Sequence, residues 1–237
     1  MKWFCLLFGC LLQSQLLAQF PKLSPEADVS LITVGPGKHL YDAFGHSAFR
    51  VKDEALGLDR VYNYGTYDSF EEGFYVQFSM GTADYQLSAY DFSRFLRSYS
   101  AQNRWLKEQV LNLKYDETQL VFEFLENNHL PQNRYYRYDQ FFDNCATKLR
   151  DVVREVLGEQ LVFQHDYIEG RPTLRDLVDE NTFNHPWGDF GIDMALGNVI
   201  DQKPEPEQYM YLPDYVSSAF ENASIQRPEG TVPAIKE

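Results

Sequence analysis

The chain has 237 residues, a length that suits one large domain or one domain with an appendage. Hydrophobic residues make up 44 % of it, including 16 Tyr and 18 Phe, so a substantial core can form. The formal net charge of -14 disfavours nucleic acid as a partner, and it disfavours purely electrostatic attachment to anionic lipid. Any membrane contact would therefore need apolar or aromatic surface.

The first residues predict a secretory signal peptide over residues 1–18. A short cationic start is followed by an apolar run over residues 3–12 and by a small residue, Ala18, at the expected cleavage point. The apolar run is too short to span a bilayer, which needs about 20 residues. A rival interpretation takes residues 7–10, which end in Cys10, as a lipoprotein signal.

The remainder mixes strand and helix patterns without strict alternation, which predicts an α+β fold in one domain over residues 19–225. Strands are expected at residues 29–34, 46–51, 60–65 and 105–113, and the second and third could pair as a hairpin. Helices are expected at residues 90–99, 116–127, 173–178, 190–200 and 211–223, and the one at 116–127 is expected to have Asp116 as its cap and Leu120, Val121, Phe124 and Leu125 as its buried stripe. Residues 70–87 are aromatic and receive no assignment, residues 185–188 predict a turn, and residues 226–237 predict a polar, disordered tail.

A further amphipathic helix is expected to begin near Cys145. Asp143 or Asn144 can cap its first N–H groups, apolar residues follow at helical spacing from Leu149, and Gly158 can end it. A thiol at this position lies at the positive end of the helix dipole, which favours the nucleophilic thiolate. Signal removal leaves Cys145 as the only cysteine, so it is either a reactive thiol or a small buried core residue.

A cysteine nucleophile needs a base and a group that orients the base. Of the five histidines, His46 is the first candidate for the base, because it follows a glycine and opens a predicted strand. His39 is a weaker candidate. The other three lie in turns or at helix ends: His129, His165 and His185. Asn63 on the next strand could orient His46, or Tyr62 or Tyr64 could do so if the strand phase differs. The backbone N–H of Cys145 would meet an oxyanion, together with a second donor that the sequence does not identify.

Other patterns are less specific. No two His or Cys residues have zinc-ligand spacing, and we expect no metal or cofactor. An aromatic cluster precedes the cysteine helix, and it could belong to the core or form a wall that binds an acyl chain: Tyr135, Tyr136, Tyr138, Phe141 and Phe142.

Two segments resemble the periplasmic domain of the Lnb-type lipoprotein N-acyltransferases. One joins Phe-Gly-His-Ser-Ala-Phe-Arg-Val at residues 44–51 to Val-Tyr-Asn-Tyr-Gly at residues 61–65; the other is residues 138–151, with the core Asp-Asn-Cys-Ala-Thr-Lys-Leu-Arg-Asp. Residues 111–113 and 187–191 add support, and the resemblance runs over about residues 29–223. It implies a circularly permuted papain-like (NlpC-like) fold, in which the histidine strand precedes the cysteine helix and an antiparallel sheet packs on that helix.

The resemblance also implies a reaction. Cys145 would take an acyl chain from a phospholipid as a thioester, His46 would act as base, Asn63 would be the third member, and the N-terminal amine of a lipoprotein would accept the chain at the periplasmic membrane surface. The alternatives are a thiol amidase or peptidase of the same fold that acts on cell-envelope peptides, or a secreted binding module without catalysis. Such proteins can carry a membrane-embedded region after this domain, so we expect either a truncated chain or another route to the membrane. The oligomeric state stays open.

Overall fold

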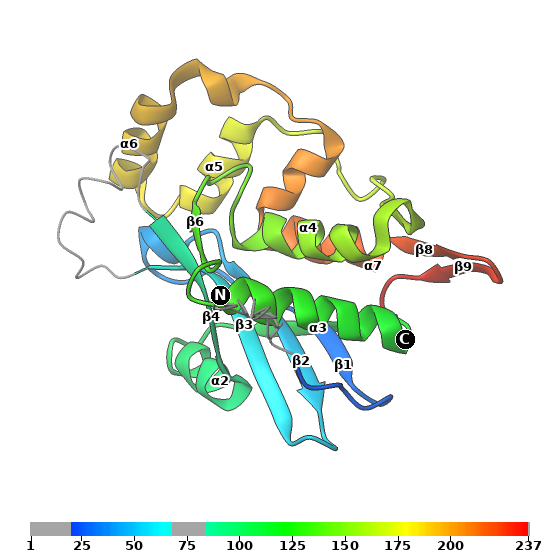
Figure 1. The fold of residues 1–237 in the computed structure, drawn as a ribbon. Helices are drawn as coiled ribbons and strands as arrows, with labels where there is room; N and C mark the ends of the chain where they lie inside the picture. Colours follow the sequence, from blue (N-terminus) through cyan, green and yellow to red (C-terminus); the bar gives the residue numbers. More distant parts are fainter. Residues whose placement is uncertain (1–19, 68–83, 237) are drawn as a thin grey trace, which may run out of the picture.

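The computed structural model describes residues 20–67 and 84–236, which form an α+β structure (Figure 1). The expected signal peptide and most of the aromatic segment at residues 70–87 lie outside the described residues. A six-stranded sheet has the order β5-β1-β2-β3-β4-β6, a smaller sheet has the order β7-β8-β9, and the strand pairs described are antiparallel. The α+β class expected from the sequence is confirmed.

The elements have the following bounds. The strands of the large sheet are β1 (Asp28–Val34), β2 (His46–Asp53), β3 (Leu58–Thr66), β4 (Asp84–Asp91), β5 (Leu106–Val110) and β6 (Tyr135–Arg137). The small sheet holds β7 (Leu161–Val162), β8 (Ser224–Arg227) and β9 (Gly230–Pro233). The helices are α2 (Phe92–Ala101), α3 (Tyr115–His129), α4 (Cys145–Leu157), α5 (Leu174–Thr182), α6 (Pro186–Leu196) and α7 (Pro213–Glu221), and the short 3-10 turns are η1 (Leu40–Asp42), η2 (Gly158–Gln160), η3 (Gly197–Asp201) and η4 (Pro206–Tyr211).

The large sheet is covered on both faces, because successive strand residues point to opposite sides. On one face Phe49 of β2 joins the core made with α3 and α4, whose members include Leu125 and Leu149. On the other face Ala48 of β2 packs with Phe95 of α2. Burial of these two apolar surfaces against helices holds α2 and α4 on opposite sides of β2.

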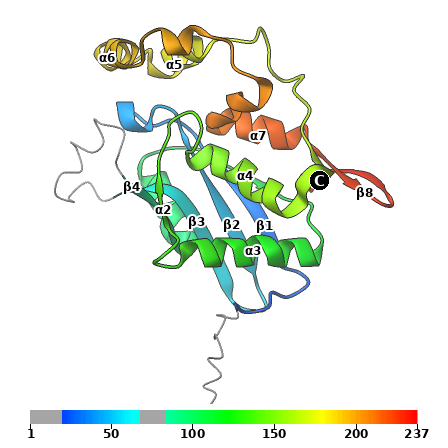
Figure 2. The same ribbon diagram turned by 45° about the horizontal axis from the view of Figure 1, so that its top comes forward.

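A third cluster lies beyond the end of the sheet where β2 begins. Leu174 and Leu177 of α5 pack there with Tyr209 and Tyr211 of η4, and Phe44 lies partly buried against them. Figure 2 shows α5 and α6 as a layer set apart from the large sheet, on the far side of α4 and α7. This layer therefore closes over the segment that leads into β2.

Three expectations about local structure were wrong in whole or in part. The helix at residues 116–127 begins at Tyr115, with Lys114 rather than Asp116 before it. Of its expected stripe, Val121 and Leu125 are buried, whereas Leu120 and Phe124 are exposed and Phe122 is buried instead. The packing of α3 against both the sheet and α4 decides which of its residues are buried, so the apolar spacing alone predicted the buried face only in part. Residues 185–188 are not a free turn but the entry to α6, because proline suits the first helical position.

The third correction concerns residues 226–237, which are not a disordered tail. They contribute to β8 and form β9, a hairpin that pairs with β7. Ala234 is buried, and its carbonyl accepts a hydrogen bond from the N–H of Asn112. The polar composition of the tail concealed Val232, which faces Ile225 across the hairpin and packs against the main core.

Candidate active site

The cysteine lies at the first position of α4, and Asn144 is the cap, one of the two expected. The Asn144 side-chain oxygen accepts from the N–H groups of Ala146 (2.8 Å) and Thr147 (2.9 Å). Its amide nitrogen donates to the carbonyls of Gln140 (2.7 Å) and Tyr211 (2.8 Å). This buried side chain therefore ties the first turn of α4 to the preceding loop and to η4.

His46 is the first residue of β2, and the chain reaches it through a tight glycine turn. Gly45 has a φ of 78°, in the left-handed region that favours glycine, and a β-carbon there would lie 2.8 Å from the carbonyl oxygen of Val34. The imidazole stacks on the ring of Tyr99 from α2, with 6.2 Å between the ring centroids. The strand and the helix thus hold the imidazole from two sides.

Asn63 of β3 is the hydrogen-bond partner of His46. Its side-chain oxygen lies 2.5 Å from His46 Nε2, and its amide nitrogen donates to the hydroxyl of Tyr90 at 2.9 Å. An amide oxygen only accepts, so Nε2 carries the proton and the other ring nitrogen, Nδ1, is left for the thiol. Asn63 is 6 % exposed, which protects this bond from water.

Cys145 and His46 influence each other's ionisation. Burial raises the pKa of the Cys145 thiol, but the charge of His46, its hydrogen bond and the N–H of Ser47 outweigh burial and lower that pKa below its usual value. Burial lowers the pKa of His46, but the charge and hydrogen bond of Cys145 and the bond to Asn63 raise it overall. Both directions favour a thiolate beside an imidazolium, which is the nucleophilic state of a cysteine.

The tyrosines that flank Asn63 lie on the opposite face of the sheet. The Tyr62 hydroxyl donates to Glu126, and the Tyr64 hydroxyl donates to Asn128 at 2.6 Å, both on α3. Because neighbouring residues in a strand point to opposite sides, only one phase of β3 can face His46. The structure therefore brings together Cys145, His46 and Asn63, and it separates Tyr62 and Tyr64 from His46.

Two residues beside the thiol were not singled out for this position by the sequence. A β-carbon on Gly65, whose φ is 78°, would lie 3.6 Å from the β-carbon of Cys145 and 3.9 Å from the hydroxyl of Tyr136. That hydroxyl oxygen is buried and finds no acceptor among the described residues. Tyr136 was expected only as a member of an aromatic cluster, and its pairing on β6 opposite Tyr85 brings it here.

Arg104 is a third residue that the sequence did not indicate. It is 9 % exposed, its Nε donates to the carbonyl of Gly35 at 2.7 Å, and its guanidinium lies 4.9 Å from the Tyr99 ring centroid. Its positive charge opposes protonation of His46. No sequence pattern marks it, because its contacts join segments far apart in the chain.

The other histidines lie in different surroundings. They are His39, which stacks on Tyr41 before η1; His129, which ends α3; His165, beside Tyr167; and His185, which precedes α6. The aromatic cluster before α4 is divided, because Tyr135 and Phe142 are exposed whereas the Tyr136 and Tyr138 rings pack with Tyr85.

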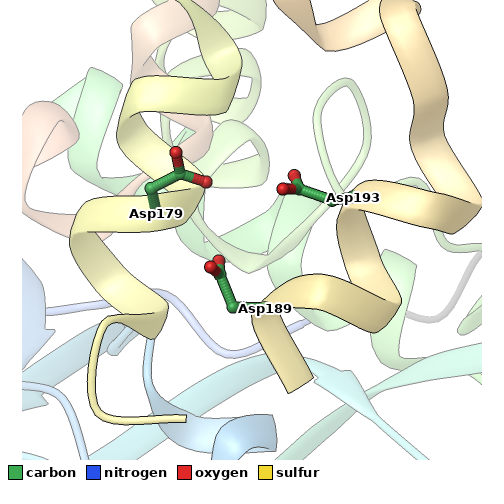
Figure 3. A group of neighbouring side chains, drawn as sticks. All are labelled: Asp179, Asp189 and Asp193. Atoms are coloured by element: carbon green, nitrogen blue, oxygen red, sulfur yellow. The ribbon is translucent and has the colours of Figure 1, made fainter. Parts of the chain in front are cut away.

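A group of acidic residues stands apart from the cysteine, between α5 and α6 (Figure 3). The carboxylates of Asp179, Asp189 and Asp193 point toward one another and have oxygens within 4.8 Å of each other. They are the one group of acidic, His and Cys side chains in the described part of the chain with a spacing that could suit a cation. Arg175 pairs with Asp193 and the Thr182 hydroxyl donates to Asp189, so the cluster is stabilised by the chain's own residues.

Fold and site together define an α+β protein in which a buried Cys and Asn meet a half-buried His where a helix begins beside an antiparallel sheet. The chain belongs to the family of Lnb N-terminal periplasmic domains, whose family model matches residues 22–180. This membership indicates a periplasmic location and a role in lipoprotein-related processing. Searches of curated proteins and of solved structures gave no match. In residues 20–67 and 84–236, no helix has the length and apolar character needed to cross a membrane.

Proposed function

We propose that the chain is a periplasmic Cys–His acyltransferase that moves an acyl chain from a phospholipid to the N-terminal amine of a lipoprotein. The observation that carries the proposal is the Cys145–His46–Asn63 arrangement at the start of α4, with the pKa of the thiol lowered and that of the imidazole raised. We also propose that the fold is a circularly permuted papain-like fold, since the histidine strand β2 precedes the cysteine helix and packs on it.

The first half of the reaction acylates the enzyme. The Cys145 thiolate attacks the carbonyl carbon of the phospholipid ester, and the carbonyl oxygen becomes an oxyanion. The carbon–oxygen bond to the glycerol then breaks, and the His46 imidazolium gives its proton to the departing alkoxide. The products are a Cys145 thioester, neutral His46 and a lysophospholipid.

The second half transfers the acyl chain. A neutral α-amine, whose ordinary pKa is about 7.7–8.0, attacks the thioester carbonyl. His46 takes a proton from the nitrogen, the carbon–sulfur bond breaks, and an amide forms. The Cys145 thiolate and the His46 imidazolium are restored for the next cycle.

Two donors are available for the oxyanion. The N–H of Cys145 belongs to the first turn of α4, where backbone N–H groups have no helical partner. The Tyr136 hydroxyl is buried, has no acceptor among the described residues, and lies beside Gly65, where a β-carbon would come within 3.6 Å of that of Cys145. The Gly65 backbone hydrogen-bonds the Tyr136 oxygen, so only the hydroxyl proton lacks a partner, and a developing oxyanion is a strong acceptor for it. Tyr136 thus supplies the second donor in this proposal.

An exposed apolar surface on the α5–α6 layer favours a lipid substrate over a soluble peptide. It comprises Phe183, Trp187, Phe190, Met194 and Val199, and we call it the α6 apolar surface. Trp187 is 87 % exposed, and residues 183–201 contain no Lys or Arg. Since the chain carries a net charge of -14, apolar insertion is the available means of contact with a bilayer. Gly188 of α6 contacts Leu40 of η1, just before His46.

The test is intact-mass measurement of the full chain mixed with phospholipid vesicles. We expect a mass increase of one acyl chain on Cys145, absent from Cys145→Ala, and its loss when a diacylglyceryl-cysteine peptide with a free α-amine is added. The same peptide with an acetylated amine is the control and should leave the adduct in place. Cleavage of envelope peptides without an acyl adduct would instead assign an amidase, and acyl transfer by Cys145→Ala would overturn the proposal.

A further inference from the structure

A hollow of about 520 Å³ lies on the α2 side of the sheet, next to the catalytic residues but not used in the mechanism above. Its walls come from β3 and β4, from α2, and from the segment between α3 and β6. The residues that line it are Thr66, Gln86, Ser88, Ala89, Tyr90, Arg94, Ser98, His129 and Arg134. The hollow is therefore built from four separate parts of the chain.

The charge in this hollow is opposite to that of the whole protein. Among the described residues, its lining includes Arg94, Arg134 and His129 and no carboxylate, although the chain has a net charge of -14. In the described segments, seven other arginines form ion pairs with carboxylates. Neither Arg94 nor Arg134 has a carboxylate partner there. Two uncompensated guanidinium groups thus share one concave surface.

One of these arginines also has an unsatisfied donor. Nε of Arg134 is buried and has no hydrogen-bond partner among the residues described. A buried, unpaired donor on a charged group is costly, and the cost is removed when an anion binds. Glu126, whose charge acts on His129 of the hollow, is already engaged by Arg60 and by Tyr62.

The hollow is linked to the catalytic residues through Tyr90. The Tyr90 hydroxyl accepts from Asn63, which leaves its own proton free to donate to a group in the hollow. Ser88 also contacts this strand, with its hydroxyl 3.5 Å from the carbonyl of Asn63. A ligand in the hollow would therefore lie one side chain away from the partner of His46.

We propose that this hollow binds a phosphate oxyanion, and that the phosphate is that of the acyl donor's headgroup. Guanidinium groups match phosphate oxygens with paired, charge-assisted hydrogen bonds, and the Tyr90 hydroxyl adds a neutral donor. The headgroup assignment rests on the proposed acyltransferase function, whereas phosphate binding itself does not. Free phosphate has the same chemistry, so the experiment must separate the two sources.

The test compares the full chain with Arg94→Gln, Arg134→Gln and the double variant. Arg97→Gln is the matched control, because Arg97 lies on the same helix and does not line the hollow. Acylation of Cys145 is followed by mass with phosphatidylglycerol vesicles and with a neutral nitrophenyl acyl ester. We expect the KM for the phospholipid to rise by roughly tenfold or more in the double variant, because charge-assisted hydrogen bonds to the phosphate are lost. The rate of acylation by the nitrophenyl ester, which has no phosphate, should stay unchanged.

Calorimetric titration with inorganic phosphate and with glycerophosphoglycerol distinguishes the sources. If the double variant binds neither inorganic phosphate nor glycerophosphoglycerol and also has the raised KM for the phospholipid, the headgroup site is supported. Loss of phosphate binding with an unchanged KM supports a phosphate site filled by the free ion and overturns the headgroup assignment. Unchanged phosphate binding, or equal loss of rate with both acyl donors, overturns the inference. If wild-type Cys145 forms no thioester with either donor, the acyltransferase proposal fails, and the titration still decides whether the hollow binds phosphate.

Discussion

The side-chain oxygen of Asn63 lies 2.5 Å from Nε2 of His46, and the other end of the same amide donates to Tyr90. Both ends of the amide are engaged, so turning it over would break two hydrogen bonds. Because Asn63 is neutral, it orients the ring without adding a charge, and Cys145 supplies the negative charge that raises the pKa of His46. Burial lowers the pKa of His46, and the charge of Cys145 is the largest of the contributions that raise it.

The reactivity of Cys145 should depend on His46. In His46→Ala the burial that raises the thiol pKa remains, while the cation that lowers it is lost, so the thiol pKa should rise. Alkylation by iodoacetamide at pH 7 should then slow, and its pH profile should move toward higher pH. His39→Ala, a loop histidine stacked on Tyr41, is the control and should match the wild type. An unchanged profile in His46→Ala would contradict the ion pair.

The pH dependence of acyl-enzyme formation should be bell-shaped. The lowered pKa of Cys145 keeps the thiolate present at pH values where an ordinary thiol is protonated, and activity falls as pH drops through it. The raised pKa of His46 keeps the imidazolium present for the leaving group, and activity falls as pH rises through it. Single-turnover acylation between pH 4 and 10 checks both limbs. A single rising limb would show that no acid is needed.

Replacing Asn63 should affect orientation more than charge. We expect Asn63→Ala to reduce acylation by roughly 10²-fold, the cost of a small misplacement of a catalytic group. Tyr64→Phe removes a hydroxyl from the adjacent strand position on the opposite face, where it bonds Asn128, and should leave acylation near the wild-type rate. Single-turnover acylation rates are measured for both variants. Equal rates for the two would show that Asn63 does not orient His46.

Gly65 should be needed for two reasons: it leaves space beside the thiol, and it tolerates the positive φ at this position. Gly65→Ala places a β-carbon 3.6 Å from that of Cys145 at a positive φ. Gly57→Ala also has a positive φ, of 62°, but meets nothing within 4 Å, so it reports the backbone strain alone. Both should lose about 1–2 kcal/mol of unfolding free energy in urea. Only Gly65→Ala should also slow acylation, and a parallel loss of rate in Gly57→Ala would refute the steric argument.

Loss of the α4 cap should destabilise the protein and the site together. Asn144→Ala removes two accepted and two donated bonds of a buried side chain, and a cap alone is worth about 0.5–2 kcal/mol. Thr173→Ala removes the cap of α5, which carries no catalytic residue, and should lower stability without changing the acylation rate. Urea unfolding followed by acylation assays under folded conditions separates these effects.

The α6 apolar surface should set the affinity for vesicles. Trp187→Glu should weaken partitioning into phosphatidylglycerol vesicles by roughly tenfold to a hundredfold, because burial of a large apolar side chain is worth about 1.5–3 kcal/mol. Leu56→Glu changes an exposed apolar residue in the β2–β3 turn and should bind as the wild type does. Sedimentation with vesicles measures both, and equal weakening would show that only net charge matters.

The sequence by itself determined the features that depend on near neighbours. The cap, the apolar spacing and Gly158 specify α4 and place Cys145 at its start, because helix ends are set by residues within one turn. Gly45 and the strand after it specify the position of His46 for a similar reason. The family was also recognisable from these same two segments.

Only the tertiary structure decided features that join distant segments. The pairing of β3 with β2 places Asn63, and not Tyr62 or Tyr64, on the side of the sheet that faces His46. Strand pairing, and not the local sequence pattern, determines which residues lie on that side. The tail folded because residues 224–233 pair with one another and with β7. Arg94 and Arg134 came to share one hollow in the same way. Burial and charge at these places depend on contacts between segments that the linear spacing does not encode.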